Sequence, residues 1–289
     1  MPHVGRPPSR AGILGAMAQL VVRRLLVDLE APIARHWNGG DAFRTAFFNA
    51  LSMSFPLGEQ IFIDAVRDGA KQLSTADATR FADEVRGFVG QEATHRRLHV
   101  LFNAQLDRHG LVNHWEGRIR RRLKLLDGVD VRARLAVTAA AEHFTAILAE
   151  HLLSHPQALE GAEPRLATLW LWHASEESEH RSTAFDLYRL LGGNEKWRLR
   201  LFRVVTFNFV TDLLRQTVHN LWRDGTLVKR RTWASGWRFL FGPGGVVREC
   251  YGPWRRYFRA DFHPEQQRTP RAEEWLREHA DMFRPLGEA

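Results

Sequence analysis

The chain has 289 residues, of which 44% are hydrophobic and 26% charged, so it is long enough to bury one large core. Its single cysteine, Cys250, excludes a disulfide framework and a thiolate zinc cluster. The net charge of +8 is unevenly spread, because residues 196–259 hold 14 Lys or Arg against 3 Asp or Glu. This segment alone is therefore strongly basic, and the rest of the chain is close to neutral.

The sequence gives no sign of a membrane span or a secretion signal. No stretch of about 18 residues is free of charged side chains, as a spanning helix would require. The mildly apolar run 11–22 lacks a small-residue cleavage site and is followed by Arg23 and Arg24. Together with the single cysteine, these features favour a cytoplasmic protein.

The first half of the chain predicts a loose arm followed by long helices. Residues 1–40 form the expected N-terminal arm, with one short helical piece. An apolar segment then covers 41–70, and we expect a break where Ser54 caps a new helix and Pro56 lies in its first turn. Helical periodicity continues in three further segments, over residues 75–108, 130–154 and 164–191.

The second half predicts a fifth helix and then shorter pieces. The fifth helix, about residues 196–222, is amphipathic and aromatic. Glycine and proline at 242–245 and 252–253 predict turns, and no strand-like alternation or internal repeat is present. We therefore expect an all-α chain. Its predicted parts are a metal-binding bundle at 41–195, a basic helical extension of the same domain at 196–265 and a polar tail at 266–289.

Acidic and histidine side chains recur on the apolar faces of four predicted helices. In chain order they are Glu59; Glu92 and His95; Glu142; and His173, Glu177 and His180. Residues three or four apart share a helix face, so the members of each group can reach one metal ion or bridge two. A ferritin-like dinuclear site needs a Glu from each of two helices and a Glu-x-x-His from each of two others. The pattern predicts a ferritin-like four-helix bundle with additional C-terminal helices.

A simpler interpretation exists for each motif taken alone. One Glu-x-x-His pair is common on solvated helix faces, and His173 by itself is compatible with core packing. Four carboxylates on core-facing stripes are harder to explain without cations, because a buried unpaired carboxylate is strongly unfavourable. We therefore expect two divalent metal ions, with iron favoured and manganese or zinc as alternatives. His99 is expected behind the ligands or in the core, and Glu176 and Glu179 in solvent.

Several segments resemble a bacterial family catalogued as predicted metal-dependent hydrolases. They are Leu51–Glu59, Gln91–His95, Trp172–Arg181, Ala184–Asp186 and Phe262–Pro264, within roughly residues 40–265. The ligand pattern with its additional histidine is similar to that of the p-aminobenzoate N-oxygenase family, a di-iron group. That likeness implies that all seven residues of the pattern bind metal. The overall sequence is not close to the N-oxygenases, so their substrate is not carried over.

Three functions are compatible with this pattern. The first is a di-iron oxygenase or oxidase that carries out O2-dependent oxidation of an unknown, hydrophobic organic substrate. The second is a metal-dependent hydrolase that uses a metal-activated water. The third is a non-enzymatic iron-binding or membrane-associated protein. The carboxylate-rich ligand set without thiolate favours the first, and the sequence shows no further general base, His-Glu-x-x-His or Gly-x-Ser-x-Gly motif that would favour the second.

The basic segment 196–259 also contains five of the ten tryptophans. Mixed arginine and tryptophan suits an anionic membrane surface, or the entrance for a lipid-like substrate, better than it suits nucleic acid. We therefore expect a small-molecule substrate and peripheral contact with the inner face of the membrane through this segment. Alternatively, residues 196–259 form an interface between two copies of the chain.

Overall fold

The computed structural model describes residues 20–126 and 128–286, so residues 1–19 of the predicted N-terminal arm lie outside the described residues. The predicted all-α class is confirmed. The α-helices are α1 (Ala42–Ala70), α2 (Thr75–Arg108), α3 (His114–Leu123), α4 (Val131–Ser154), α5 (Pro164–His180), α6 (Thr183–Leu190), α7 (Glu195–Arg223), α8 (Arg230–Phe241), α9 (Val246–Arg256) and α10 (Arg271–Glu278). Short 3-10 helices cover Lys124–Leu126, Pro156–Leu159, Pro264–Gln267 and Ala280–Met282, and two strands are β1 (Arg23–Leu25) and β2 (Phe283–Pro285).

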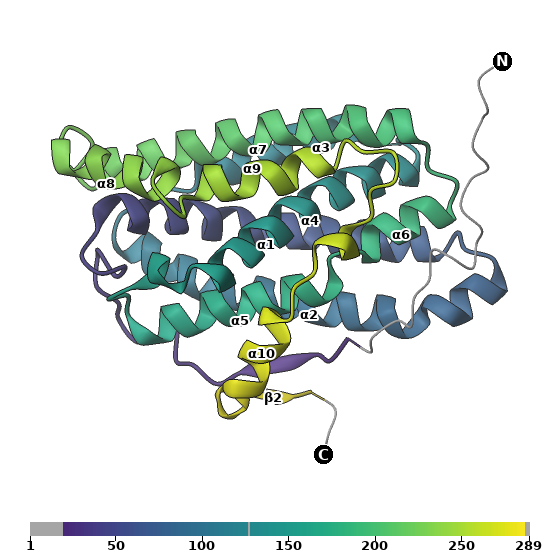
Figure 1. Ribbon diagram of the computed structural model, residues 1–289, viewed down its shortest axis with the longest axis horizontal. Helices are drawn as coiled ribbons and strands as arrows, with labels where there is room; N and C mark the ends of the chain where they lie inside the picture. The colour runs from purple at the N-terminus through teal and green to yellow at the C-terminus, as the bar shows by residue number, and fades with distance from the viewer. Residues whose placement is uncertain (1–19, 127, 287–289) are drawn as a thin grey trace.

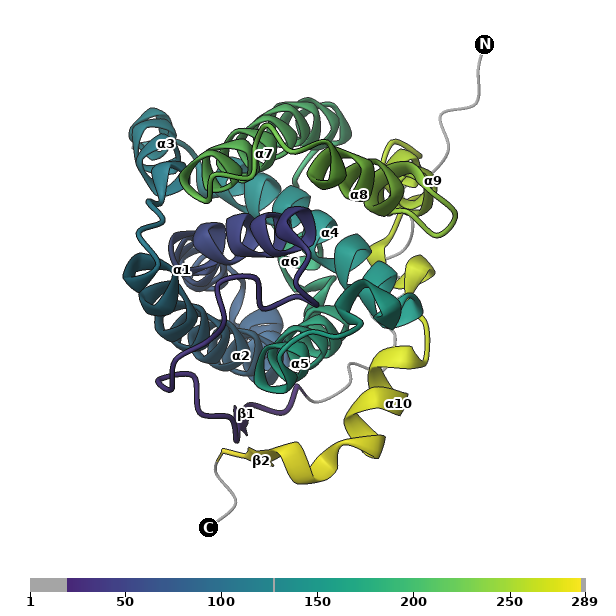
Figure 2. The same ribbon diagram turned by 90° about the vertical axis from the view of Figure 1, so that its left-hand side faces the viewer.

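The long helices form a ferritin-like bundle with additional C-terminal helices. α1 packs against α2, α4 packs against α5, and α1 and α4 contact each other. Seen from the end, α1 and α4 form a middle layer, with α2 and α5 on one side and α7 and α8 on the other (Figure 2). In Figure 1, α7, α8 and α9 run along the top of this bundle. The basic extension predicted from the sequence therefore covers one side of the bundle formed by α1, α2, α4 and α5.

α1 is one continuous helix, so the predicted break before Pro56 is wrong. Proline removes the N–H that would donate to the carbonyl four residues earlier. In α1 that carbonyl belongs to Ser52, and the side-chain amide of Asn103 in α2 donates to it over 3.0 Å. The amide of Asn113 likewise donates to the Met53 carbonyl over 2.7 Å. Because neighbouring side chains replace the missing donor, Glu59 lies inside a long helix.

The prediction of one helix over 164–191 is also wrong, because two helices, α5 and α6, cover this segment. They are separated at Arg181 and Ser182. The buried Arg181 side chain donates to the Ser178 carbonyl over 3.2 Å and pairs with Glu150 of α4. The break accompanies a contact between helices and has no local glycine or proline. Further along, the turn predicted at 242–245 is confirmed, whereas residues 252–253 lie inside α9.

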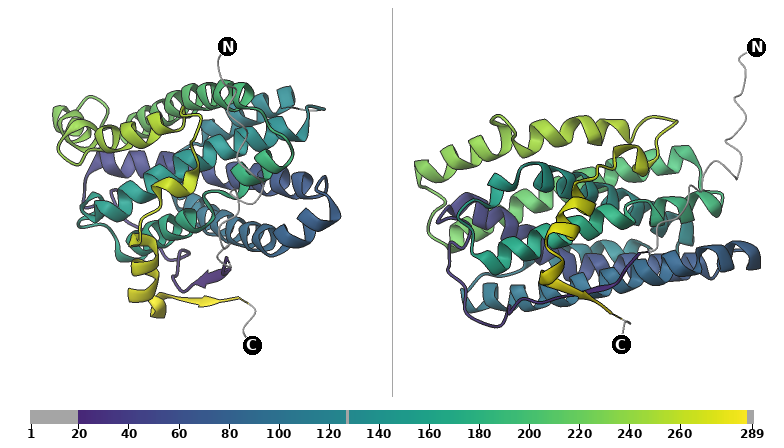
Figure 3. Two further views of the ribbon diagram at one scale, coloured as in Figure 1. Left: turned by 45° about the vertical axis from the view of Figure 1, so that its right-hand side comes forward. Right: turned by 60° about the horizontal axis from the view of Figure 1, so that its bottom comes forward.

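Both ends of the described chain return to the same side of the bundle. β1 and β2 pair antiparallel, with Arg23 opposite Pro285 and Leu25 opposite Phe283. The C-terminal segment crosses α4 and α5 before it reaches α10 and β2 (Figure 3). The Thr269 hydroxyl donates to Glu150 over 2.6 Å on this path. Residues 266–286 are therefore packed against the bundle.

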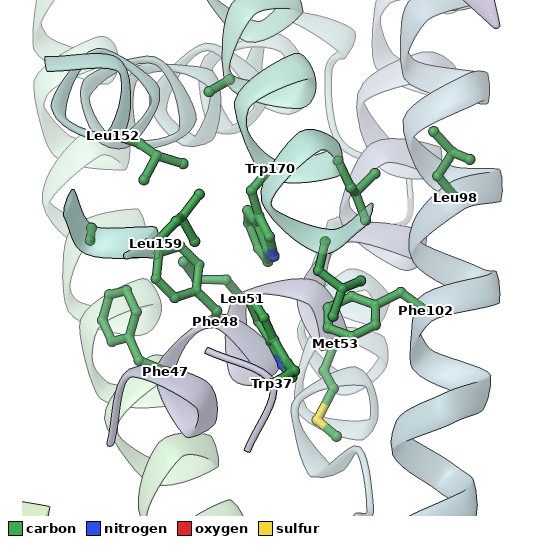
Figure 4. Close-up of a cluster of buried hydrophobic side chains, with 14 of the residues drawn as sticks. Trp37, Phe47, Phe48, Leu51, Met53, Leu98, Phe102, Leu152, Leu159 and Trp170 are labelled. Atoms are coloured by element: carbon green, nitrogen blue, oxygen red, sulfur yellow. The ribbon is translucent and has the colours of Figure 1, made fainter. Parts of the chain in front are cut away.

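Aromatic and aliphatic side chains from several helices fill the core at one end of the bundle. Trp170 of α5 lies beside Phe48 and Leu51 of α1 (Figure 4), and the Trp170 and Phe48 rings are 4.9 Å apart. Trp37, from the segment before α1, donates its indole N–H to the Asn49 side chain over 2.8 Å. This packing fixes α1 against α5, the two helices that carry Glu59 and His173.

The segment that precedes α1 lies close against α2. A Cβ atom added at Gly87 would be 2.4 Å from Leu20 Cβ and 2.8 Å from the Leu20 carbonyl oxygen. We predict that Gly87→Ala lowers the free energy of unfolding by about 1–3 kcal/mol, because backbone has to move. Gly117→Ala, on the exposed side of α3, is the matched control and should gain up to about 1 kcal/mol. Urea unfolding measures the free energy of unfolding of both variants. A Gly87→Ala variant that is stabilised as much as Gly117→Ala would contradict the close contact between Gly87 and Leu20.

Candidate metal centre

The structure brings together all seven residues of the predicted site. α1 supplies Glu59, α2 supplies Glu92 and His95, α4 supplies Glu142, and α5 supplies His173, Glu177 and His180. All are buried, and the most exposed, Glu177, is 4% exposed. Helical periodicity explains the convergence, because each helix turns its polar group inward on a face that is otherwise apolar.

The donor atoms form overlapping groups, each with all its atoms within 4.8 Å of one another. The groups are Glu59–Glu92–His95, His95–His173–Glu177, Glu92–Glu142–Glu177–His180 and Glu59–His99–His173. Glu92 and Glu177 belong to groups on both sides of the cluster. The arrangement can therefore hold metal, with Glu59 and His173 at one end and Glu142 and His180 at the other.

Many of these buried donor atoms have no hydrogen-bond partner within the described residues. They are both carboxylate oxygens of Glu59, Glu92 and Glu142, Oε2 of Glu177, Nδ1 of His95 and Nε2 of His180. An unsatisfied buried polar atom is costly, and native proteins contain few. Carboxylate and imidazole donors without thiolate suit iron, manganese or zinc. The residues present therefore fit divalent cations.

The electrostatics of the cluster point the same way. Burial raises the pKa of Glu59 and of Glu142 well above the usual carboxyl range, and the neighbouring carboxylates raise it further. Burial also raises the pKa of Glu92. Burial acts in the same direction on Glu177, but His180, His173 and His95 outweigh it and hold its pKa well below the usual range. Without cations, part of the site must therefore hold protons in place of metal charge.

Each of the two Glu-x-x-His histidines is oriented by a residue of the facing helix. His95 of α2 contacts Glu176 of α5, with Nε2 3.0 Å from the carboxylate. His180 of α5 contacts Gln91 of α2, with Nδ1 2.9 Å from the amide oxygen. The other ring nitrogen of each histidine faces the donor cluster. Such outer contacts fix the tautomer and the direction of a metal-binding imidazole.

A second row of charges supports these contacts. Arg23 of β1 lies 3.0 Å from Glu176 and 2.7 Å from Glu179, and Gln91 donates to Glu179 over 2.7 Å. The expectation that Glu176 and Glu179 are solvated is therefore wrong: Glu176 is fully buried, and burial raises its pKa to about 8. Arg23 comes from outside the bundle, which is why helix periodicity alone does not predict its contact.

His173 has its own chain of contacts, on the far side from the cluster. Its Nδ1 lies 2.8 Å from His99 Nε2, and His99 Nδ1 lies 2.8 Å from the Ser52 hydroxyl. Ser52 in turn donates to the Asn103 side chain over 2.7 Å. The Nε2 atom of His173 is left facing Glu177, at 2.9 Å. His99 is thus buried beside His173, and it also belongs to the Glu59–His99–His173 group, so its place behind the ligands stays a prediction.

The sequence contained a signal for two of the residues that it did not predict. Gln91 directly precedes Glu92, and Glu176 directly precedes Glu177, so each Glu-x-x-His motif is extended by one polar residue. The extended motif Gln/Glu-Glu-x-x-His occurs on both α2 and α5. Each added residue orients the histidine of the other helix, which only their packing reveals.

Comparison with known proteins gives one match. A family model described as "Predicted metal-dependent hydrolase" matches residues 21–268, which include all seven residues of the cluster, and confirms the resemblance expected from the sequence. No curated protein and no solved structure matches the chain. Within residues 20–126 and 128–286, no helix is long and apolar enough to cross a membrane.

We predict that Glu92→Ala and Glu177→Ala each remove metal and lower stability together. Both residues belong to groups at each end of the cluster, and bound metal stabilises the folded state. Metal analysis and thermal unfolding of the purified variants test this. The control is Glu274→Ala on α10, an exposed carboxylate. Normal metal content in both cluster variants would contradict the ligand assignment.

We also predict that the metal-free protein loses stability as pH rises from about 7 to 8.5. Unfolded carboxyl groups are ionised there, whereas burial raises the folded pKa of Glu59 and Glu142 well above 4.5 and that of Glu176 to about 8. Each group that is protonated in the folded chain and ionised in the unfolded chain lowers the free energy of unfolding by about 1.4 kcal/mol per pH unit. Burial lowers the pKa of His173 from 6.5 to about 4, so this histidine makes stability rise with pH, but only between these two values.

Urea unfolding of chelator-treated protein across this pH range measures the slope. Glu176→Gln is the matched variant, because it keeps the side-chain shape and removes the group whose pKa burial raises to about 8. Its slope should be shallower than that of the unchanged protein. A metal-free protein whose stability is constant or rises over this range would show that the carboxyl groups are ionised without metal.

Proposed function

This chain belongs to the predicted metal-dependent hydrolase family, and we propose that it hydrolyses a small organic substrate with two divalent cations. The proposed ligands are Glu59, Glu92, His95, Glu142, His173, Glu177 and His180. The observation that carries the proposal is the set of buried carboxylate and imidazole atoms that converge without hydrogen-bond partners in the described chain. Two cations would balance the charge of the four carboxylates.

The cations would supply a water of lowered pKa as the nucleophile and polarise the bond to be cleaved. The chain's own residues do the positioning. Glu176, Gln91 and His99 hold the three imidazoles in one orientation each, with contacts of 2.8–3.0 Å. Aromatic side chains such as Phe88, Phe55 and Trp172 pack against the same imidazoles and exclude bulk water. A dry, rigid site strengthens the electrostatic interactions within it.

O2-dependent oxidation of an organic substrate by a di-iron centre is the second candidate. The donor set supports it, because carboxylates and imidazoles without thiolate suit iron or manganese better than they suit structural zinc. The same seven side chains would hold the cations in either case. The two candidates therefore differ in the metal that is bound and in the reaction with O2, and not in the ligand residues.

The deciding experiment is metal analysis of protein purified with and without air, followed by two assays. One assay follows the ferrous protein after mixing with O2 in a stopped-flow spectrometer, and the other measures cleavage of a panel of esters, amides and phosphate esters. Hydrolysis that requires metal, with no optical response to O2, supports the proposal. About two irons per chain with a transient visible band would favour oxidation, as this ligand class allows. Metal binding with neither reaction would favour a non-enzymatic role.

A further inference from the structure

A cavity with mostly apolar walls lies beside the candidate metal centre. Its volume is about 60 Å³, and it lies between α1, α4 and α5, with side chains of α7, α8 and α9 on its outer side. His173 and Glu177 of the metal centre line it. Most of the remaining wall is aliphatic or aromatic, and includes Phe48, Leu51, Phe55, Leu148, Trp170 and Phe239.

The apolar wall begins directly at a proposed ligand. The Phe55 ring lies 4.8 Å from the His173 ring, and Phe48 and Trp170 continue the wall (Figure 4). The two further polar side chains of the lining offer little to a polar ligand. The Thr145 hydroxyl already donates to the Glu142 carbonyl over 2.9 Å. His151, whose buried Nδ1 has no hydrogen-bond partner within the described residues, is therefore left as the single polar contact that this wall offers beyond the metal centre.

We propose that this cavity receives the unbranched aliphatic chain of the substrate, with the reacting group at Glu177 and His173. The proposal rests on the proposed function, because it assigns the substrate class of the same site. A charged or strongly polar chain would lose its hydration here without enough partners. An engineered apolar cavity that accommodates benzene measures about 150 Å³, so a space of about 60 Å³ takes only the first few carbons of the aliphatic chain.

Binding of a homologous series of primary alcohols, from methanol to octanol, tests the cavity without any reaction. The titrations use the metal-loaded, full-length protein in a calorimeter. Affinity should rise about fourfold for each added methylene group until the cavity is full. Ala149→Phe fills the cavity from α4 and should abolish this dependence while metal content stays unchanged. Ala104→Phe, at an exposed position of α2, is the control and should bind like the unchanged protein.

Leu148→Trp provides a second test in case Ala149→Phe does not fold, because Leu148 is only partly buried. Affinity that is independent of chain length, or unaffected by both variants, would overturn the assignment. Failure of the proposed function looks different: the alcohols would bind with the expected dependence, but the metal-loaded protein would cleave none of the esters, amides and phosphate esters of the assay panel. Chain-length dependence without turnover would therefore keep the cavity assignment and reject the reaction.

A different observation concerns the outer face of α7. Apolar residues three or four positions apart are exposed along this helix: Val204, Phe207, Val210, Leu214, Val218 and Trp222. Phe207 is 68% exposed and Trp222 is 59% exposed. Trp237 of α8 and Tyr251 of α9 are exposed as well, and both helices lie on the same side of the bundle as α7 (Figure 1). Monomeric soluble proteins seldom expose so long an apolar stripe.

The charges around this stripe are almost all positive. Exposed arginines accompany it on α7, α8 and α9: Arg200, Arg203, Arg215, Arg223, Arg230, Arg238 and Arg248. The acid in the middle of α7, Asp212, is buried and paired with Arg118 and Arg122 of α3. A second copy of this face would bring like charges together, and phosphate backbone offers nothing to an aliphatic stripe. An anionic lipid surface matches both features.

We infer that the α7–α9 face binds peripherally to an anionic membrane surface. Flotation of the full chain with phosphatidylcholine vesicles, with and without phosphatidylglycerol, tests this. Binding should require phosphatidylglycerol, weaken with salt and be lost in the double variant Phe207→Glu with Leu214→Glu. Val100→Glu, at an exposed position of α2, is the control and should still bind. Absence of binding at low salt, or a dimer that the double variant dissociates, would overturn the inference.

Discussion

The structure depends on the burial of four carboxyl groups in one apolar interior. Glu59, Glu92, Glu142 and Glu177 come from four different helices and face one another, so the folded chain concentrates negative charge where water is excluded. Such an arrangement is stable only if protons or cations compensate the charge. Without cations, protons compensate the charge, and the pKa of Glu59, Glu92 and Glu142 is accordingly raised. The donor atoms without hydrogen-bond partners are suited to cations instead. A cation bound at this site would therefore stabilise the folded chain.

Compensation of buried charge extends to both ends of the described chain. Arg23 compensates Glu176 and Glu179, and its strand β1 is held by β2 from the C-terminal segment. The Arg23 guanidinium also lies 5.5 Å from the centre of the Phe283 ring in β2. Segments that are distant in sequence thus meet behind His95, and loss of either would leave a buried carboxylate without its partner. Removing one partner of a buried ion pair is typically more destabilising than replacing both partners by apolar residues.

The two proposals on binding describe one side of the molecule. The cavity lies beneath α7, α8 and α9, and the exposed apolar stripe lies on the outer surface of the same helices. An aliphatic substrate dissolved in a membrane would then have a short path from the lipid to Glu177 and His173. The two proposals remain separable, because alcohol binding reports on the cavity alone and vesicle binding reports on the surface alone.

The sequence by itself determined the all-α class, most helix positions and the seven residues that converge, because helical spacing carries this information locally. Their role as ligands stays a prediction, whereas their convergence is observed. Only the tertiary structure decided what depends on contacts between distant segments. Asn103 of α2 lets α1 continue through Pro56, Arg181 contacts α4 where α5 ends, and Arg23 buries Glu176. In each case a partner remote in sequence supplies the hydrogen bond or charge, so no local pattern contains it.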